Sequence, residues 1–151
     1  MLLLPSAAWG DETPMDTTAL LQAIYAAYRE KRLADVLDFL DDSFRYVIHL
    51  PDELLLGGSA TRDKQETRKL FSHFMDTYDF LAFEPGPIIV TGDRALVNSH
   101  VRFRHKQTGK QLSTRIQQTW GIKDGKAVSL EEEHDKAAVE AFIKSIREEG
   151  P

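Results

Sequence analysis

The stretch that decides the fold is residues 94–134, RALVNSHVRFRHKQTGKQLSTRIQQTWGIKDGKAVSLEEEH. Apolar and polar side chains alternate along most of it, which is the two-residue period of a β-strand. The tetrapeptide QTGK and the pair Asp124-Gly125 interrupt the alternation with residues that favour tight turns. The stretch therefore predicts a meander of three long antiparallel strands, at Arg94–His105, at Gln111–Lys123 and from Lys126 onward.

The residues before the meander are mainly helical in pattern. Apolar residues at helical spacing predict helices at 16–31, 33–40 and 63–78. Between the second and third helices, FRYVIHL at 44–50 predicts a strand that Pro51 ends, and Gly57-Gly58 predicts a turn. Helices first and strands afterwards are typical of an α+β domain.

Two further segments complete this architecture. Residues 83–90 predict a strand at the edge of the sheet, because Pro85 and Pro87 cannot donate to a strand ladder, and a hairpin turn follows at 91–93. Apolar residues at helical spacing predict a last helix at 137–146. The expected fold is a curved antiparallel sheet, a cone, wrapped around three N-terminal helices, plus a C-terminal helix.

Length and composition limit the class of protein. The chain has 151 residues, which suggests one domain, and a formal net charge of −5 with scattered lysine and arginine. It has no cysteine, which excludes disulfides and thiolate metal ligands. No apolar run approaches the roughly 18 residues needed to span a bilayer. We therefore expect no nucleic-acid or membrane partner and a cytoplasmic location, with 1–14 a disordered lead-in, Met15 an alternative start and 15–151 a single domain.

The glutamates after the last apolar run raise the question of which side chains point inward. If the strand continues unbroken past Leu130, alternation places Glu132 and His134 on the buried face and Glu131 and Glu133 in water. Alternatively, the strand ends at Leu130 and the acids form the first turn of the last helix, or a β-bulge changes the parity. The inward alternative places a carboxyl and an imidazole side by side.

Three segments resemble the nuclear transport factor 2-like superfamily, particularly its SnoaL-like branch. ADVLDFLDDSF at 34–44 is similar to the family's second helix and first strand, TGDRALV at 91–97 to its turn into a long strand, and WGIKDGKAVSLEEEHD at 120–135 to its last hairpin. The resemblance implies a cone that encloses an apolar pocket. The family includes ketosteroid isomerase, polyketide cyclases, limonene epoxide hydrolase and scytalone dehydratase, as well as domains that only bind ligands, so it does not fix the function.

The resemblance also implies positions for catalytic groups. The isomerase base falls at Val47, which cannot move a proton, and His49 lies two residues further along the same strand. An imidazole is a workable base at neutral pH, although an idle, half-exposed histidine is the alternative. The isomerase's oxyanion-stabilising acid falls near Gln118, whose amide can donate a hydrogen bond or serve only as a satisfied buried amide. The arginine and one aspartate of the epoxide hydrolase fall at Ser99 and Val101, so the sequence argues against that reaction.

These considerations define the candidate site. Glu132, His134, His49 and Gln118 are the candidate catalytic residues, and no cofactor or metal is expected. The substrate pocket is expected to be lined by side chains from the helices and the inner sheet face, namely Tyr25, Tyr28, Tyr46, Phe71, Phe74, Ser99, Thr114 and Trp120.

Three functional hypotheses follow. The first is a SnoaL-like domain that binds a small apolar ligand with no established reaction. The second is a cofactor-free acid–base enzyme, an isomerase, cyclase or dehydratase acting on an apolar carbonyl compound, with Glu132 or His49 as base, His134 as its partner and Gln118 as carbonyl donor. The third is an accessory dimerisation domain. A homodimer is expected through the outer face of the sheet.

Overall fold

The structure is a computed structural model and describes residues 16–50 and 61–149. The expected lead-in at 1–14 and the turn at Gly57-Gly58 lie outside the described residues. Within the described ranges, helices precede most of the strands, as the sequence predicts. The helices are α2 (Thr17–Arg29), α3 (Leu33–Asp38), α4 (Lys64–Thr77) and α5 (Lys136–Glu149).

Six strands form one curved sheet. In spatial order they run β1-β6-β5-β4-β2, and β3 also pairs with β4. Strand β1 pairs with β6 in parallel, whereas the other pairs are antiparallel. The sheet is therefore mixed and not purely antiparallel, because the long connection between β1 and β6 allows a parallel pair. The strand bounds are β1 Leu40–His49, β2 Tyr78–Pro85, β3 Ile89–Thr91, β4 Arg94–His105, β5 Gln111–Lys123 and β6 Lys126–His134.

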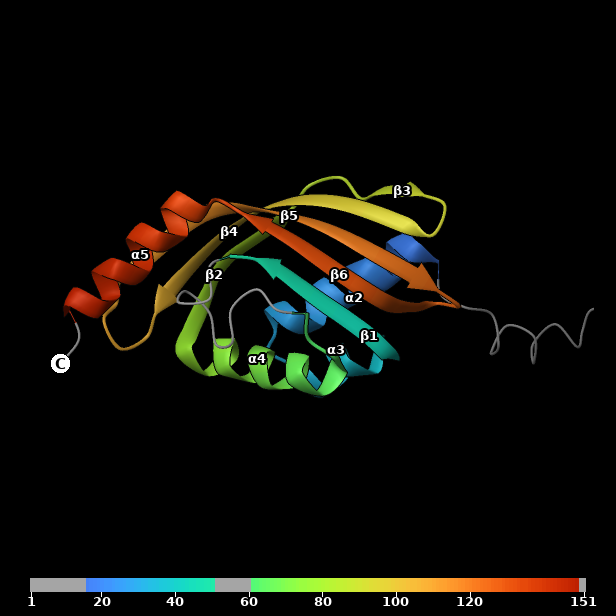
Figure 1. Ribbon diagram of the computed structural model, residues 1–151, viewed down its shortest axis with the longest axis horizontal. Coiled ribbons are helices and arrows are strands. Elements are labelled where there is room, and N and C mark those ends of the chain that lie inside the picture. The colour runs from blue at the N-terminus through green and yellow to red at the C-terminus, as the bar shows by residue number, and fades with distance from the viewer. Residues whose placement is uncertain (1–15, 51–60, 150–151) are drawn as a thin grey trace, which may run out of the picture.

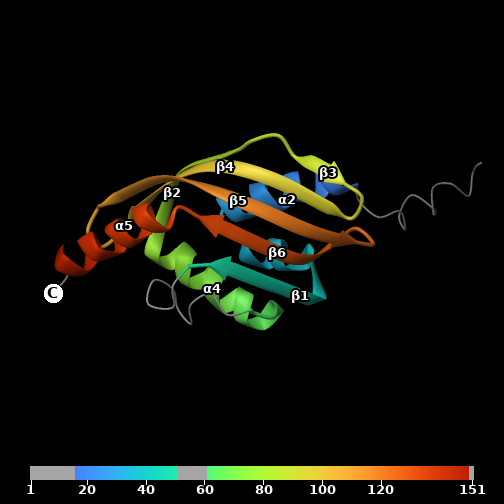
Figure 2. The same cartoon turned by 45° about the horizontal axis from the view of Figure 1, so that its top comes forward.

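The sheet arches over the helices and encloses the core. Helices α2, α3 and α4 lie beneath its concave face, whereas α5 extends from one end of it (Figure 1, Figure 2). The core is built from the apolar faces of α2 and α4 and the inner side chains of the strands, such as Leu21, Leu70 and Val97. None of the helices within the described ranges is long and apolar enough to cross a membrane.

Side-chain caps explain where two of the helices begin. The Asp16 carboxylate accepts a hydrogen bond from the backbone of Ala19 and caps α2. Asp63 and Glu66 form a reciprocal capping box at the start of α4, which satisfies two backbone N–H groups that the helix cannot pair itself. The caps fix the entry of each helix, and therefore the face that it turns toward the sheet.

The turns between the long strands use residues that tolerate a positive φ. Asp124 and Gly125 have φ values of 53° and 74°, which suits a two-residue hairpin, and Gly109 has a φ of 75°. The predicted strands β4 and β5 have the expected bounds, and β6 continues unbroken to His134.

The structure corrects two strands. Strand β1 begins at Leu40 and not at Phe44, so the acidic pair Asp41-Asp42 lies within the strand and does not separate it from a helix. The predicted strand at 83–90 is two strands, of which β2 starts at Tyr78 directly after α4. A register shift between Phe80 and Ala82 hides the alternation of β2 in the sequence.

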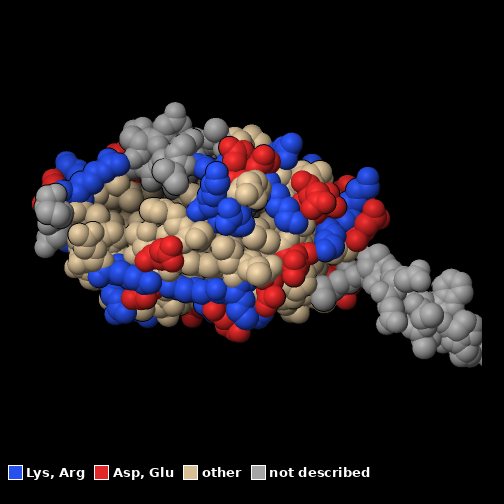
Figure 3. Space-filling model, turned by 90° about the horizontal axis from the view of Figure 1, so that it is seen from below, with Lys and Arg blue, Asp and Glu red and all other residues tan. Residues whose placement is uncertain are grey.

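The charges on the helical side of the molecule are mixed in sign. Seen from below, a central band of mostly uncharged atoms lies between rows of charged side chains in which both signs are interspersed (Figure 3). A surface of this kind produces no strong field of a single sign, which a polyanion would require.

Candidate functional site

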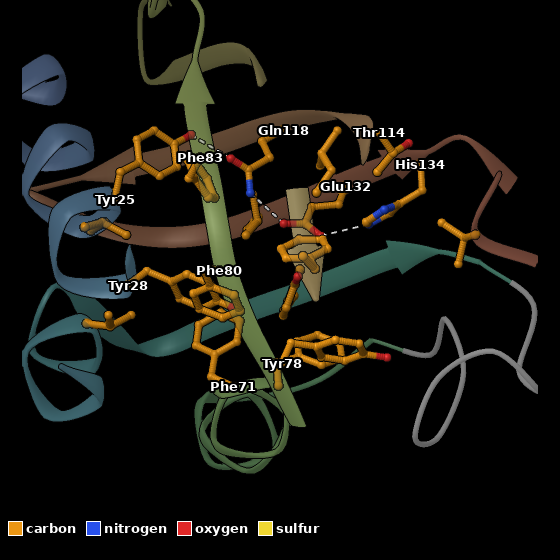
Figure 4. A pocket seen from close by; sticks show the side chains of 18 of the residues that line it. Tyr25, Tyr28, Phe71, Tyr78, Phe80, Phe83, Thr114, Gln118, Glu132 and His134 are labelled. Carbon is orange, nitrogen blue, oxygen red and sulfur yellow. Dashed lines mark hydrogen bonds and ion pairs between the residues drawn. The ribbon is translucent and has the colours of Figure 1, made fainter. Parts of the chain in front are cut away.

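A cavity lies between the helices and the inner face of the sheet. Its volume is about 140 Å³, and its wall is mainly aromatic and aliphatic. An apolar cavity of about this size is sufficient for a benzene-sized molecule. Side chains from α2, α4, β2, β5 and β6 converge on the cavity (Figure 4). The predicted pocket residues that line it are Tyr25, Tyr28, Tyr46, Phe71, Phe74, Thr114 and Trp120.

Glu132 and His134 are the ionisable pair on this wall. Both lie on the inner face of β6, where the unbroken strand places them, and their side chains are only 8% and 12% exposed. The Nε2 atom of His134 is 3.0 Å from Oε1 of Glu132 (Figure 4). A bulge at Val128 leaves this parity intact, although it buries Ala127 in place of Val128.

A chain of hydrogen bonds connects Glu132 to the core. The Trp120 indole N–H donates to the Tyr25 hydroxyl at 2.9 Å, and that hydroxyl donates to Oε1 of Gln118 at 2.6 Å. Nε2 of Gln118 in turn donates to Oε2 of Glu132 at 2.6 Å. Gln118 and Glu132 are direct cross-strand partners, so the register of β5 and β6 positions this contact.

These contacts determine the ionisation of the buried groups. Burial raises the pKa of Glu132, but the hydrogen bond and the charge of His134, together with Gln118 and Tyr46, outweigh it and hold the pKa below its usual 4.5. Burial raises the pKa of Tyr25, Tyr28 and Tyr46, and the negative charge of Glu132 adds to that effect. At neutral pH the cavity therefore holds a carboxylate among neutral phenols.

Some polar groups on the cavity wall have no partner in the described part of the chain. The hydroxyls of Tyr28 and Thr114 make no hydrogen bond there, and neither does the second ring nitrogen of His134. The hydroxyl of Tyr25 differs because it both accepts and donates a hydrogen bond. Tyr28, Thr114 and His134 thus have hydrogen-bonding capacity left for a ligand, as does the second side-chain N–H of Gln118.

Two predicted site residues do not line the cavity. His49 lies on the outer face, because the inward residues of β1 are Phe44, Tyr46 and Ile48. The structure therefore contradicts its assignment as a base in the pocket. Ser99 points inward and is 2% exposed, but it lies outside the cavity, and its hydroxyl has no hydrogen-bond partner among the described residues.

Strand β2 and helix α5 contribute wall residues that the sequence analysis did not assign to the pocket. Strand β2 was expected to begin only at 83, and its shifted register obscured the inward aromatic series. The apolar stripe of α5 was recognised as a helix face, but nothing in the sequence showed what it covers. These residues are Tyr78, Phe80, Phe83, Val139, Phe142 and Ile143.

The outer face carries the one group of metal-ligand type found in the described ranges. Nε2 of His49 lies 3.3 Å from Oε1 of Glu131 and 3.5 Å from Oε2 of Glu133. Both glutamates are more than half exposed. Exposed ion pairs have the same geometry without a metal, so this group is no evidence for one.

Comparison with known proteins supports the fold. No curated protein matches the chain. IdmH from Streptomyces antibioticus, described as a candidate polyketide cyclase, is 17% identical, with a TM-score of 0.71 over 86% of this chain and 99% of its own. TerC, crystallised with polyporic acid, is 21% identical, with a TM-score of 0.71 over 84% and 97%. A candidate isomerase from Rhodopseudomonas palustris is 13% identical, with a TM-score of 0.72 over 83% and 93%. At these identities the similarity shows the fold alone.

The family assignment comes from the sequence match. The SnoaL-like domain family matches residues 21–130, which is most of the chain and runs from within α2 to the first part of β6. The curved sheet over helices, confirmed above, is the fold of the nuclear transport factor 2-like superfamily. This chain belongs to the SnoaL-like domain family.

Proposed function

We propose that this domain binds a small, uncharged, apolar ligand in its cavity, with Glu132 and His134 as the main polar contact. The observation that supports this most directly is the cavity itself, an aromatic enclosure with polar groups gathered on one wall. Binding sites for small molecules have this composition. No lysine or arginine lines the cavity in the described ranges, which disfavours an anionic ligand.

A cavity-filling variant tests this proposal. Ile116→Trp places a large ring in the cavity, whereas Gln117→Trp places the same ring on the exposed outer face of the same strand. In saturation-transfer NMR with phenol as probe, we expect a signal from the unmodified chain and from Gln117→Trp, and a lost signal from Ile116→Trp. Equal signals from both variants, or none from the unmodified chain at millimolar probe, would contradict the proposal.

The second candidate is cofactor-free acid–base catalysis on an apolar carbonyl compound. It is favoured by the buried contact between Glu132 and His134 and by the free second nitrogen of His134. In this mechanism that nitrogen takes a proton from the carbon next to the carbonyl, and Glu132 stabilises the resulting imidazolium. The electron pair moves onto the carbonyl oxygen, to which a remaining N–H of Gln118 or the Tyr28 hydroxyl donates.

Proton exchange distinguishes catalysis from binding alone. We expect an active domain to accelerate the exchange of the α-protons of cyclohexanone with D₂O, followed by NMR. Glu132→Gln should lower that rate by about 100-fold or more, because the imidazolium loses its counter-charge. If the domain only binds, no variant changes the rate from that of buffer.

The remaining expectations are proposals of their own. A homodimer through the outer face of the sheet, in an accessory or a catalytic role, would cover residues such as Arg102 and Arg115, which point away from the core. Sedimentation of the unmodified chain and of Arg115→Glu tests it, because a new charge at the interface should shift the population toward monomer. The cytoplasmic location is likewise proposed, and cell fractionation tests it.

A further inference from the structure

We infer that Trp120 and Tyr25 fix the orientation of the Gln118 side-chain amide and thereby add to the stabilisation of the ionised form of Glu132, which makes both of them positioning residues. Neither residue contacts Glu132 through a hydrogen bond. The inference deepens the proposed function, and its consequence for a ligand rests on that function. The geometry of the hydrogen bonds from Trp120 to Glu132 does not depend on the proposed function.

The series of hydrogen bonds from Trp120 to Glu132 runs in one direction, because its first member, the indole N–H, can only donate. The indole N–H of Trp120 has no acceptor capacity, so the Tyr25 oxygen must accept from it. The single hydroxyl proton of Tyr25 is then left to donate, and it points to Oε1 of Gln118. The amide oxygen of Gln118 therefore faces Tyr25, and its NH₂ group faces Glu132.

The flipped amide would be costly while Glu132 is charged. It would place the Gln118 oxygen 2.6 Å from a carboxylate oxygen, where two acceptors repel each other. It would also leave the Tyr25 hydroxyl proton without an acceptor in a buried site. A flipped Gln118 could be accommodated only if Glu132 took up a proton and became a donor. Amide orientation and carboxyl protonation are thus coupled.

The backbone holds this arrangement in place. Gln118 and Trp120 lie two residues apart on the inner face of β5, and both are buried. Tyr25 approaches them from α2, with its ring edge-on to the Trp120 ring at 6.0 Å. Four titratable groups either influence the ionisation of Glu132 or are influenced by its charge. They are His134 on the same strand, Tyr46 on β1, and Tyr25 and Tyr28 on α2. The only one of these residues that is cationic when protonated is His134.

The fixed orientation of the Gln118 amide has a consequence for the charge of Glu132. His134 and Gln118 together stabilise the Glu132 carboxylate, and the fixed amide ensures that Gln118 presents an N–H group and not its oxygen. Removal of the Tyr25 hydroxyl should therefore weaken the stabilisation of the Glu132 carboxylate, although no hydrogen bond joins these two residues.

The test is a titration of the ligand-free full chain. The carboxyl carbon of Glu132 is followed by ¹³C NMR against pH, and the Gln118 side-chain N–H resonances are recorded at neutral pH. Tyr25→Phe should raise the Glu132 midpoint by at least about half a pH unit and move the Gln118 resonances upfield. Gln118→Met should raise the midpoint further, and Trp120→Phe should raise it less.

Tyr28→Phe is the matched control. It removes a tyrosine hydroxyl from the same helix as Tyr25, but that hydroxyl takes no part in the series of hydrogen bonds from Trp120 to Glu132. An unchanged midpoint and unchanged Gln118 resonances in Tyr25→Phe overturn the inference. So does an unchanged midpoint in Gln118→Met, or an equal shift in Tyr28→Phe. Because no ligand is present, failure of the proposed ligand binding leaves these results unaffected, and the two failures are distinguishable.

Discussion

Two clusters of the same residue types lie on opposite faces of strand β6. Inside, Glu132 and His134 are nearly buried, and Glu132 makes hydrogen bonds with both His134 and Gln118. Outside, Glu131 and Glu133 flank His49 with side chains that are 59%, 55% and 37% exposed. The three glutamates are consecutive in the sequence, so strand alternation alone assigns them to different environments.

The difference shows that environment, and not residue type, makes a functional candidate. A surface ion pair is screened by water and salt and contributes little to stability. A buried carboxylate depends on its partners, because it has lost its hydration. Substitution of one residue from each cluster therefore tests whether the inner and outer clusters differ in their contribution to stability.

The largest effect should come from Glu132→Ala. It removes the hydrogen-bond partner of His134 and of the Gln118 NH₂ group in a buried site, so we expect the free energy of unfolding to fall by about 3 kcal/mol. Urea denaturation at neutral pH measures it. Glu133→Ala, the same change one residue along on the outer face, should cost less than about 1 kcal/mol. Equal losses for the two variants would remove the distinction between the faces.

A smaller effect is expected from pH. The pKa of Glu132 in the folded protein is lower than its usual 4.5, so the unfolded chain binds that proton more readily. Its contribution to stability is therefore present above pH 4.5 and is lost as the pH falls through the lowered value. The stability advantage of the unmodified chain over Glu132→Gln should shrink below pH 4.5, as measured by denaturation at a series of pH values. A constant difference would argue against an ionised Glu132.

The smallest effect should come from the outer cluster. His49→Ala removes the shared partner of two exposed glutamates, and we expect a change in unfolding free energy of less than about 1 kcal/mol. Because any such contribution is screened, it should decrease further when salt is raised from low to about 1 M. A large or salt-independent loss would show that the cluster has a role beyond a surface ion pair.

The meander was predictable because its signals are local. Turn residues at Gly109 and Asp124-Gly125 and unbroken alternation fix strands β4 and β5 and the inward position of Glu132. The parallel pair of β1 and β6 was not predictable, because alternation does not say which strand is the neighbour. The prediction that His49 points into the pocket failed for a related reason. The resemblance gave its position along the sequence but not the face of β1 on which it lies.

The cavity wall was predictable only in part. The aromatic residues of α2 and α4 stand out at helical spacing, and they do line the cavity. The aromatic residues of β2 were missed because the strand follows α4 without a turn signal and contains a register shift. The hydrogen-bond chain from Trp120 to Glu132 depends on packing between α2 and the sheet, which no single-sequence pattern encodes.

The parallel pairing of β1 with β6 also has a consequence for synthesis. Tyr46 finds its strand partner, Leu130, only near the end of the chain. A nascent chain that emerges from the ribosome therefore exposes one edge of β1 until β6 has left the exit tunnel, and contacts of such long sequence separation form slowly. The wall with Glu132 and His134 thus forms late, and premature termination before β6 would leave β1 without its partner and the sheet prone to aggregation.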